Sequence, residues 1–308
     1  MDSKILLWLT ILIILYTSLP LFFFKKVTNS IHYPERVLYY KLKKYDLYPG
    51  EQFEKVATED VEITSIDDLK LRGTYIPYLD QKGNECSDNT IILVHGYTTS
   101  SVFMMQYIDT FQEHGWNILL IDQRGHGKSE GKYASYGRYE KYDLDSWVDW
   151  VVKRNGKDSV IGLLGVSMGA ATVLQYAQIN NYVDFIIADC GYSDMEELLK
   201  YQFDVRDIRV QPYYDRINYL LNKRLGFYAE EVSPIKAIAD QEVPIMFIHG
   251  SEDDFVPTYM SEEMYKIKPG VKKILIIEGA EHAEAYVINK QLYEKEMWLF
   301  IDSVLANR

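Results

Sequence analysis

Beyond about residue 58, the chain consists of short continuous apolar runs separated by longer amphipathic segments. A short run that is apolar throughout and rich in Ile, Leu and Val is typical of a strand buried on both faces. Strands that alternate with helices form a mostly parallel sheet covered by helices on both sides. The runs are TIILVHG (90–96), NILLIDQ (117–123), VIGLLGVS (160–167), VDFIIADC (183–190), VPIMFIHG (243–250) and KKILIIEG (272–279).

The stretch VEITSIDDLKLRGTYIPY (61–78) instead alternates apolar and polar residues on either side of a turn at residues 66–68. Alternation with a period of two is typical of half-buried strands, so we expect an antiparallel hairpin here. Helical patterns lie between the later runs, for example at 139–155 and 170–178. Together these features predict an α/β fold whose ligands bind beyond the carboxyl ends of the strands.

One interval departs from this alternation. Residues 191–240 separate two runs by far more chain than a simple crossover needs, and they contain several short apolar-patterned pieces. We predict that this interval is a helical lid, inserted after the sixth strand of one large domain at 58–308.

The segment ILLWLTILIILYTSLPLFFF (5–24) has no charged residue and is followed at once by two lysines. Its 20 residues form about 30 Å of helix, enough to cross a bilayer. The segment lacks the small-residue cleavage site of a signal peptide. We therefore expect a single-pass anchor in the cell membrane at 1–27 and a basic connector at 28–57. The positive-inside rule places the body on the cytoplasmic side, although long domains cross membranes regardless of flanking charge.

The 33 basic and 45 acidic residues give a net charge of −12, which disfavours a nucleic-acid partner. Cys86 lies in a polar stretch and Cys190 ends an apolar run, so we expect two free thiols rather than a disulfide framework. The spacing of histidines and cysteines does not suggest a metal site, and we expect no metal or organic cofactor.

Ser167 is the candidate nucleophile. It lies in GVSMG (165–169), which fits the pattern G-x-S-x-G, after an apolar run and before the helix-forming AATVLQYA. This strand-turn-helix context is what a nucleophile elbow requires. The small flanking residues suit a strained turn, and the following helix directs its amide dipoles toward developing negative charge.

A serine hydroxyl needs a base within hydrogen-bond reach to become nucleophilic. His282, in a polar loop after the last run, is the one histidine that follows a plausible acid in the chain. The stretch HGSEDDFVP (249–257) offers Glu252, Asp253 and Asp254 as that acid. Chemistry alone does not choose between the two aspartates.

Other polar residues at the ends of runs have simpler interpretations. His95 and His249 each precede a glycine at a strand end, where we expect structural roles. The same holds for Asp189. We expect the loop RGHGKSEG (124–131), which includes Arg124, to be scaffolding at the rim of the site.

The chain resembles the serine α/β-hydrolases, in particular the bacterial serine aminopeptidase and monoglyceride-lipase-like group. The resemblance runs from about residue 58 to the end. It is closest to poorly characterised bacterial members that have an N-terminal hydrophobic segment. It rests on LVHGYTTS (93–100), IDQRGHGKSEG (121–131), GVSMG (165–169), HGSEDDFVP (249–257) and GAEH (279–282), in that order.

The resemblance implies roles for individual residues. The family order of serine, acid and histidine is preserved, and the family pattern G-x-x-D-x-x-V-P falls on residues 250–257, which assigns the acid to Asp253. The family's H-G-x motif makes the Tyr97 amide one oxyanion donor, with the Met168 amide as the other. A small residue is usual at the position of Tyr97, but this role uses only the backbone.

We therefore expect a serine hydrolase that cleaves an ester, thioester or amide bond through an acyl-enzyme, with Ser167, Asp253 and His282 as its triad. Its partner would be a small acyl substrate, and a membrane anchor would favour lipid-derived ones. One alternative is a cofactor-free perhydrolase or haloperoxidase, which uses the same triad. The other is a non-enzymatic scaffold.

Overall fold

An eight-stranded sheet forms the centre of the molecule, in the order β1-β2-β4-β3-β5-β6-β7-β8. The computed structural model describes residues 3–29, 33–49, 58–207 and 213–308. The strands are β1 (Glu59–Thr64), β2 (Lys70–Ile76), β3 (Thr90–Val94), β4 (Asn117–Ile121), β5 (Ile161–Val166), β6 (Phe185–Asp189), β7 (Ile245–Gly250) and β8 (Lys272–Ile277). β1 and β2 form the predicted antiparallel hairpin, and β3 to β8 are parallel. The mostly parallel sheet is therefore confirmed.

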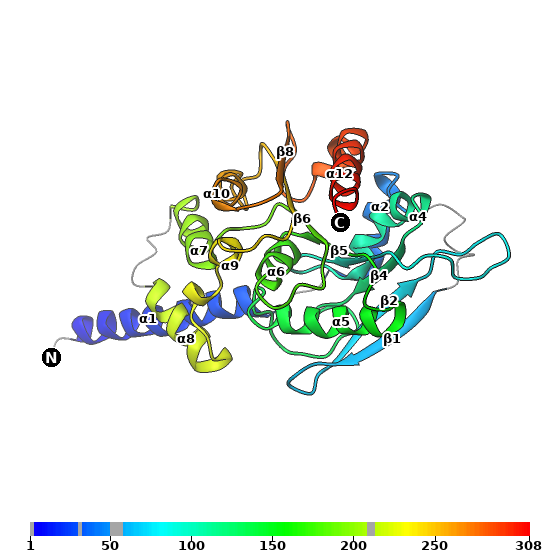
Figure 1. Ribbon diagram of the computed structural model, residues 1–308. Helices are drawn as coiled ribbons and strands as arrows, with labels where there is room; N and C mark the ends of the chain where they lie inside the picture. The colour runs from blue at the N-terminus through cyan, green and yellow to red at the C-terminus, as the bar shows by residue number, and fades with distance from the viewer. Residues whose placement is uncertain (1–2, 30–32, 50–57, 208–212) are drawn as a thin grey trace.

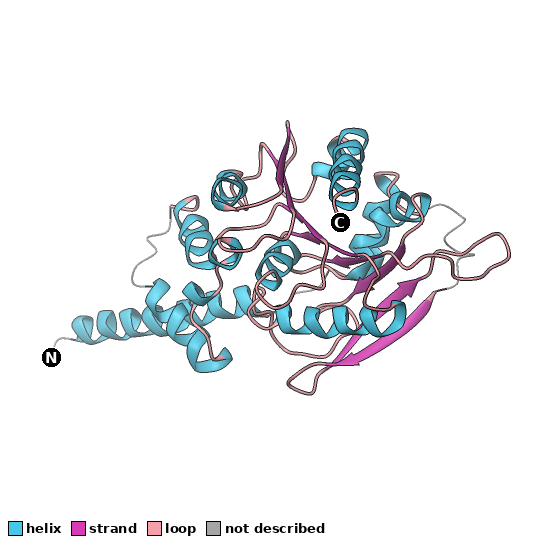
Figure 2. Cartoon of the chain, viewed as in Figure 1, coloured by secondary structure: helices cyan, strands magenta, loops and turns pink. Residues whose placement is uncertain are grey.

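Helices cover both faces of this sheet (Figure 2). One face packs against α2, α3, α4 and α12, and the other against α5, α6, α9 and α10. The helices are α1 (Ser3–Thr28), α2 (Glu35–Lys44), α3 (Ser101–Met104), α4 (Ile108–Glu113), α5 (Glu140–Asn155), α6 (Met168–Tyr176), α7 (Met195–Asp204), α8 (Tyr213–Leu225), α9 (Pro234–Ile238), α10 (Tyr259–Ile267), α11 (Ala285–Ile288) and α12 (Lys290–Leu305), with 3₁₀ turns η2 (Met105–Tyr107) and η3 (Ala229–Glu231).

The continuous apolar runs are explained by burial on both faces. In β3, Ile91 and Leu93 belong to the core beneath α4 and α12, whereas Ile92 and Val94 belong to the core beneath α5 and α6. Successive side chains of a strand point to opposite faces, so a strand between two helical layers must be apolar at every position.

The interval at 191–240 contains α7, α8, η3 and α9, between β6 and β7. Residues 208–212 of this lid lie outside the described residues. Its apolar side chains form a third cluster, which includes Phe203, Ile217, Leu221 and Phe227. This third cluster is separate from the two beside the sheet, and it also includes Ala171 of α6 and Met260 of α10.

The predicted membrane anchor is wrong. Within the described part of the chain, the helices are all too short or too polar to cross a bilayer. The apolar end of α1 packs on protein instead: Phe24 is 2% exposed within the lid cluster, and the ring of Phe23 lies 5.2 Å from that of Phe203. Figure 1 shows α1 beside α8. The predicted membrane partner and cell-membrane localisation are therefore also wrong. Because the preference for lipid-derived substrates depended on the anchor, that preference has no support either.

The connector predicted at 28–57 includes α2, which packs on the sheet through Leu38 and Leu42. Residues 30–32 and 50–57 of that connector lie outside the described residues. Both cysteines are free thiols, Cys86 exposed and Cys190 buried, as expected.

Candidate active site

Ser167 stands at the turn between β5 and α6, with backbone angles φ 57° and ψ −116°. A positive φ in a residue with a side chain is strained and costs about 1–3 kcal/mol. Glycines allow the close approach of neighbouring chain at this turn. A Cβ on Gly169 would overlap the carbonyl oxygen of Val94, and a Cβ on Gly165 would overlap the backbone of Gly169.

His282 lies in the loop between β8 and α11, and it contacts both of the other predicted residues. Its Nε2 is 2.9 Å from Ser167 Oγ, and its Nδ1 is 2.7 Å from Asp253 Oδ2. An ionised carboxylate only accepts hydrogen bonds, so Nδ1 carries the ring proton. Nε2 is then free to accept the proton of the serine hydroxyl, which is what a general base must do.

Asp253 follows β7, and its side chain is completely buried. Burial alone would raise the pKa of this carboxyl, but hydrogen bonds from His249 and His282, the charge of His282 and the amide of Val256 together lower the pKa well below its usual value. Oδ1 accepts from the amides of Phe255 and Val256, at 3.0 and 2.8 Å. Asp253 is therefore held ionised in a fixed orientation.

The other two acids of this loop lie differently. Glu252 and Asp254 are both exposed to solvent, whereas Asp253 points inward to His282. The choice between the aspartates that chemistry left open thus has a geometric basis.

His249 is a residue whose contact with the site the sequence reasoning missed. Its Nε2 lies 3.1 Å from Asp253 Oδ2 and 2.8 Å from the carbonyl oxygen of Val256, and its Nδ1 lies 2.7 Å from Ser261 Oγ. The side chain is fully buried. The sequence signal that could have indicated this contact is the position of His249, four residues before Asp253, with a turn between them that folds back on the end of β7.

The two predicted oxyanion donors flank Ser167 from different elements. Met168 is the first residue of α6, so its amide has no acceptor within the helix. Tyr97 follows β3, and a Cβ built on the preceding Gly96 would lie 3.3 Å from Ser167 Cβ. The chain from Gly96 to Thr98, called here the oxyanion turn, therefore passes directly beside the serine.

A series of buried hydrogen bonds holds His95, the residue that precedes this turn. The amide of Gln123 donates to His95 Nε2 at 3.0 Å, and the Gln123 side chain bonds the His95 carbonyl oxygen at 2.5 Å. Thr172 of α6 in turn donates to the Gln123 side chain. The structural role expected for His95 thus consists of linking the ends of β3 and β4 to α6.

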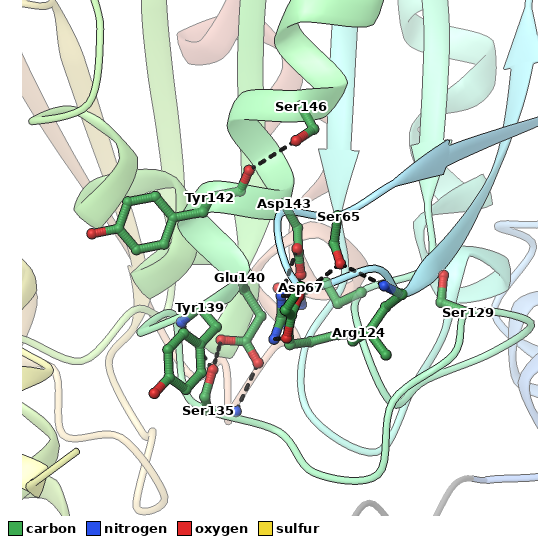
Figure 3. A network of polar contacts seen from close by, with 12 residues as sticks. Ser65, Asp67, Arg124, Ser129, Ser135, Tyr139, Glu140, Tyr142, Asp143 and Ser146 are labelled. Atoms are coloured by element: carbon green, nitrogen blue, oxygen red, sulfur yellow. Dashed lines mark hydrogen bonds and ion pairs between the residues drawn. The ribbon is translucent and has the colours of Figure 1, made fainter. Parts of the chain in front are cut away.

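Arg124 belongs to a second supporting network, drawn in Figure 3. Its guanidinium forms two hydrogen bonds with Asp143 of α5 and two with Asp67 of the β1–β2 turn. Both Arg124 and Asp143 are buried. Glu140, one turn earlier on α5, accepts from the amides of Ser135 and Gly137. These contacts use the guanidinium of Arg124 to connect the loop at 124–131 with α5 and the β1–β2 turn, which is the scaffolding role expected for this loop.

Asp189 and Cys190 lie buried behind the serine, at the end of β6. Burial raises the pKa of Asp189 to about 6, although Tyr293 donates to its Oδ2 at 3.1 Å. Burial also raises the pKa of the Cys190 thiol. The Asp189 carbonyl oxygen accepts from the Ser167 amide at 2.8 Å, which helps to hold the turn.

Cys190, Asp253 and His282 each place one possible metal-ligand atom within 4.8 Å of the others. The Asp253 and His282 atoms nearest one another already share the Nδ1 proton in a 2.7 Å hydrogen bond. The geometry of these two residues therefore fits proton transfer better than metal coordination.

A cavity of about 630 Å³ lies elsewhere, between α2 and the β1–β2 hairpin. Its lining includes Glu35, Tyr39, Arg72 and Asp122 but neither Ser167 nor His282. The cavity is therefore separate from the residues described above.

Residues 89–216 match the family described as the alpha/beta hydrolase fold. The uncharacterized protein YqkD of Bacillus subtilis (strain 168) is 35% identical over 257 residues, which are 82% of this chain and 82% of YqkD. The thiohydrolase aneE of Aspergillus aculeatus is 31% identical over 141 residues, which are 44% of this chain and 42% of aneE.

Among solved structures, the Pyrococcus furiosus esterase Pf2001 superposes with a TM-score of 0.65 at 24% identity, over 83% of this chain and 96% of the esterase. At 24% identity, this similarity shows that the two proteins share a fold and nothing more.

Proposed function

The chain belongs to the α/β-hydrolase fold family, and we propose that it is a serine hydrolase that cleaves an ester, thioester or amide bond through an acyl-enzyme. One observation carries the proposal: Ser167, His282 and Asp253 form a continuous row of hydrogen bonds of 2.9 and 2.7 Å. The row begins at a strained residue between a strand and a helix, which is the usual position of the nucleophile in this family.

In the proposed reaction, Ser167 Oγ attacks the carbonyl carbon of the substrate and His282 Nε2 takes the hydroxyl proton. His282 then gives that proton to the leaving alcohol, thiol or amine, and an acyl group remains on the serine. Water attacks the acyl-enzyme by the same route. Asp253 keeps the imidazole in the required tautomer and stabilises its positive charge.

The negative charge that develops on the substrate oxygen needs donors that are already in place. We assign this role to the amides of Tyr97 and Met168. One donor of this kind contributes about 3–4 kcal/mol to transition-state stabilisation, because it requires no reorganisation during the reaction.

The test is labelling of the full chain with a fluorophosphonate, which reacts with activated serines, beside its Ser167→Ala variant. We expect covalent labelling of the wild type and none of the variant. A folded wild type that does not react would contradict the proposal. Hydrolysis would then be followed with p-nitrophenyl esters and acyl thioesters, because the similar proteins include an esterase and a thiohydrolase.

A further inference from the structure

The side chain of Tyr97 reaches across to the N-terminal helix. Its single hydroxyl proton is shared between the carbonyl oxygens of Asn29 and Lys26, which lie 2.9 and 3.2 Å from the hydroxyl oxygen. Burial raises the pKa of this phenol to about 12, so the hydroxyl remains a donor at neutral pH. The residue thus links two segments about 70 positions apart in the chain.

These contacts belong to a larger docking arrangement. The last carbonyl oxygens of a helix find no N–H donor within the helix and therefore need donors from outside it. At the end of α1 the hydrolase body supplies them. The donors are the Tyr97 hydroxyl for Lys26 and Asn29, the Tyr136 hydroxyl for Val27 and the Ala134 amide for Thr28.

The backbone of Tyr97 meanwhile lies in the oxyanion turn beside Ser167. This turn is strained, since Thr98 has a φ of 64°, and the Thr98 carbonyl oxygen accepts from the amide of Tyr33 at 2.9 Å. The Tyr97 ring stacks on Tyr136 with centroids 5.6 Å apart. Segments on both sides of residues 30–32 therefore bind the turn, one through its side chain and one through its backbone.

We propose that Tyr97 is a positioning residue whose hydroxyl binds the oxyanion turn to α1. The N-terminal helix then helps to hold the Tyr97 amide in place for catalysis. The inference rests on the proposed function. It assigns a purpose to a large side chain at a position where the oxyanion role itself needs only a backbone amide. It also gives α1, which packs on the lid through Phe24, a role in catalysis.

Tyr97→Phe and Tyr136→Phe form a matched pair. Each removes one hydroxyl that bonds the end of α1 and keeps the ring, but Tyr136 does not belong to the oxyanion turn. The measurements are kcat and KM for p-nitrophenyl butyrate, the rate of fluorophosphonate labelling, and stability in urea, all on the full chain.

We expect Tyr97→Phe to lower kcat and the labelling rate about tenfold, with KM nearly unchanged, because a displaced donor weakens binding of the transition state rather than of the substrate. Tyr136→Phe should keep the wild-type kcat at a similar loss of stability, because it leaves both Tyr97 contacts with the end of α1 and the packing of Phe24 in place. Equal kcat values in the two variants would overturn the inference. A wild type that fails to label would instead contradict the proposed function.

Phe24→Ala supplies an independent test, and its single-variant kcat decides the matter if Tyr97→Phe does not fold. It loosens α1 from the lid without touching the oxyanion turn, so kcat should again fall. In the double variant Phe24→Ala/Tyr97→Phe, the Tyr97→Phe substitution should lower kcat by a smaller factor than it does in the wild type, because the effects of coupled residues are not additive. An unchanged kcat in Phe24→Ala, or strict additivity, would contradict the coupling.

Discussion

His249 and His282 approach the same oxygen of Asp253, at 3.1 Å from Nε2 of the first and 2.7 Å from Nδ1 of the second. Two imidazoles therefore share one carboxylate oxygen. Any rotation of the carboxylate changes both contacts at once, so each histidine restrains the position of the oxygen that the other one uses. We expect this balance to fix the orientation of the base.

His249→Gln should therefore lower kcat/KM, by up to ~10²-fold if Asp253 shifts by about 1 Å. The measurement is steady-state ester hydrolysis. Ser261→Ala is the control, because it removes the partner of His249 Nδ1 without touching Asp253. A kcat/KM in His249→Gln equal to that of the wild type would show that the second histidine is dispensable.

Asp253→Asn should reduce kcat by about 10⁴-fold, because an amide can donate to Nδ1 and so favour the wrong tautomer of His282. Asp254→Asn should stay close to wild-type activity, because Asp254 is exposed. Both variants remove one negative charge from the same loop, so charge alone cannot explain a difference between them. The reverse ranking would reassign the acid.

The lowered pKa of Asp253 also predicts how stability depends on pH. The folded state binds this proton less readily than the unfolded state, whose Asp pKa is about 3.9. The resulting stabilisation is fully present above that value and is lost as the pH falls toward the folded pKa. Urea unfolding at pH 6 and pH 3 should therefore give a larger stability difference between wild type and Asp253→Asn at pH 6. A difference that grew on acidification would contradict the assignment.

Arg124→Gln should destabilise the fold by ~3–5 kcal/mol, because it leaves the buried Asp143 carboxylate without its partner. Urea unfolding measures this. Arg72→Gln is the control: Arg72 pairs with Glu62 in a solvent-exposed contact, and such pairs contribute about 0–1 kcal/mol. Similar losses in the two variants would mean that the network of Figure 3 adds nothing beyond a surface pair.

Phe24→Ala should cost ~3 kcal/mol of stability, the usual range for a buried phenylalanine. Phe22→Ala, two residues earlier on α1, should have little effect, because Phe22 is 59% exposed. Unfolding in urea compares them directly. If both substitutions proved neutral, the docking of α1 on the lid would be unsupported.

Much of the fold follows from short-range pattern. Ile91 to Val94 could be recognised as a strand because both faces of a central strand are buried, which leaves no polar position. The candidate site followed from topology: Ser167, Asp253 and His282 come after the ends of parallel strands, and parallel strands end at one edge of the sheet.

What the sequence could not reveal depends on packing between distant segments. An apolar helix looks the same whether lipid or protein covers it, so the contact of Phe24 with the lid could not be anticipated. His249 has the same difficulty: a histidine before a strand-end glycine contacts Asp253 only because of how the following turn folds. The hydroxyl of Tyr97 likewise depends on where α1 comes to lie.

The end of α1 has a practical consequence for work with this protein. Proteolysis or shortening that removes the chain up to and including Asn29 would leave the Tyr97 and Tyr136 hydroxyls without their carbonyl partners and uncover apolar lid side chains around Phe203. A contiguous apolar patch exposed in this way promotes self-association. Shortened versions should therefore aggregate at lower concentration than the full chain, and crystallisation or screening is better begun with α1 intact.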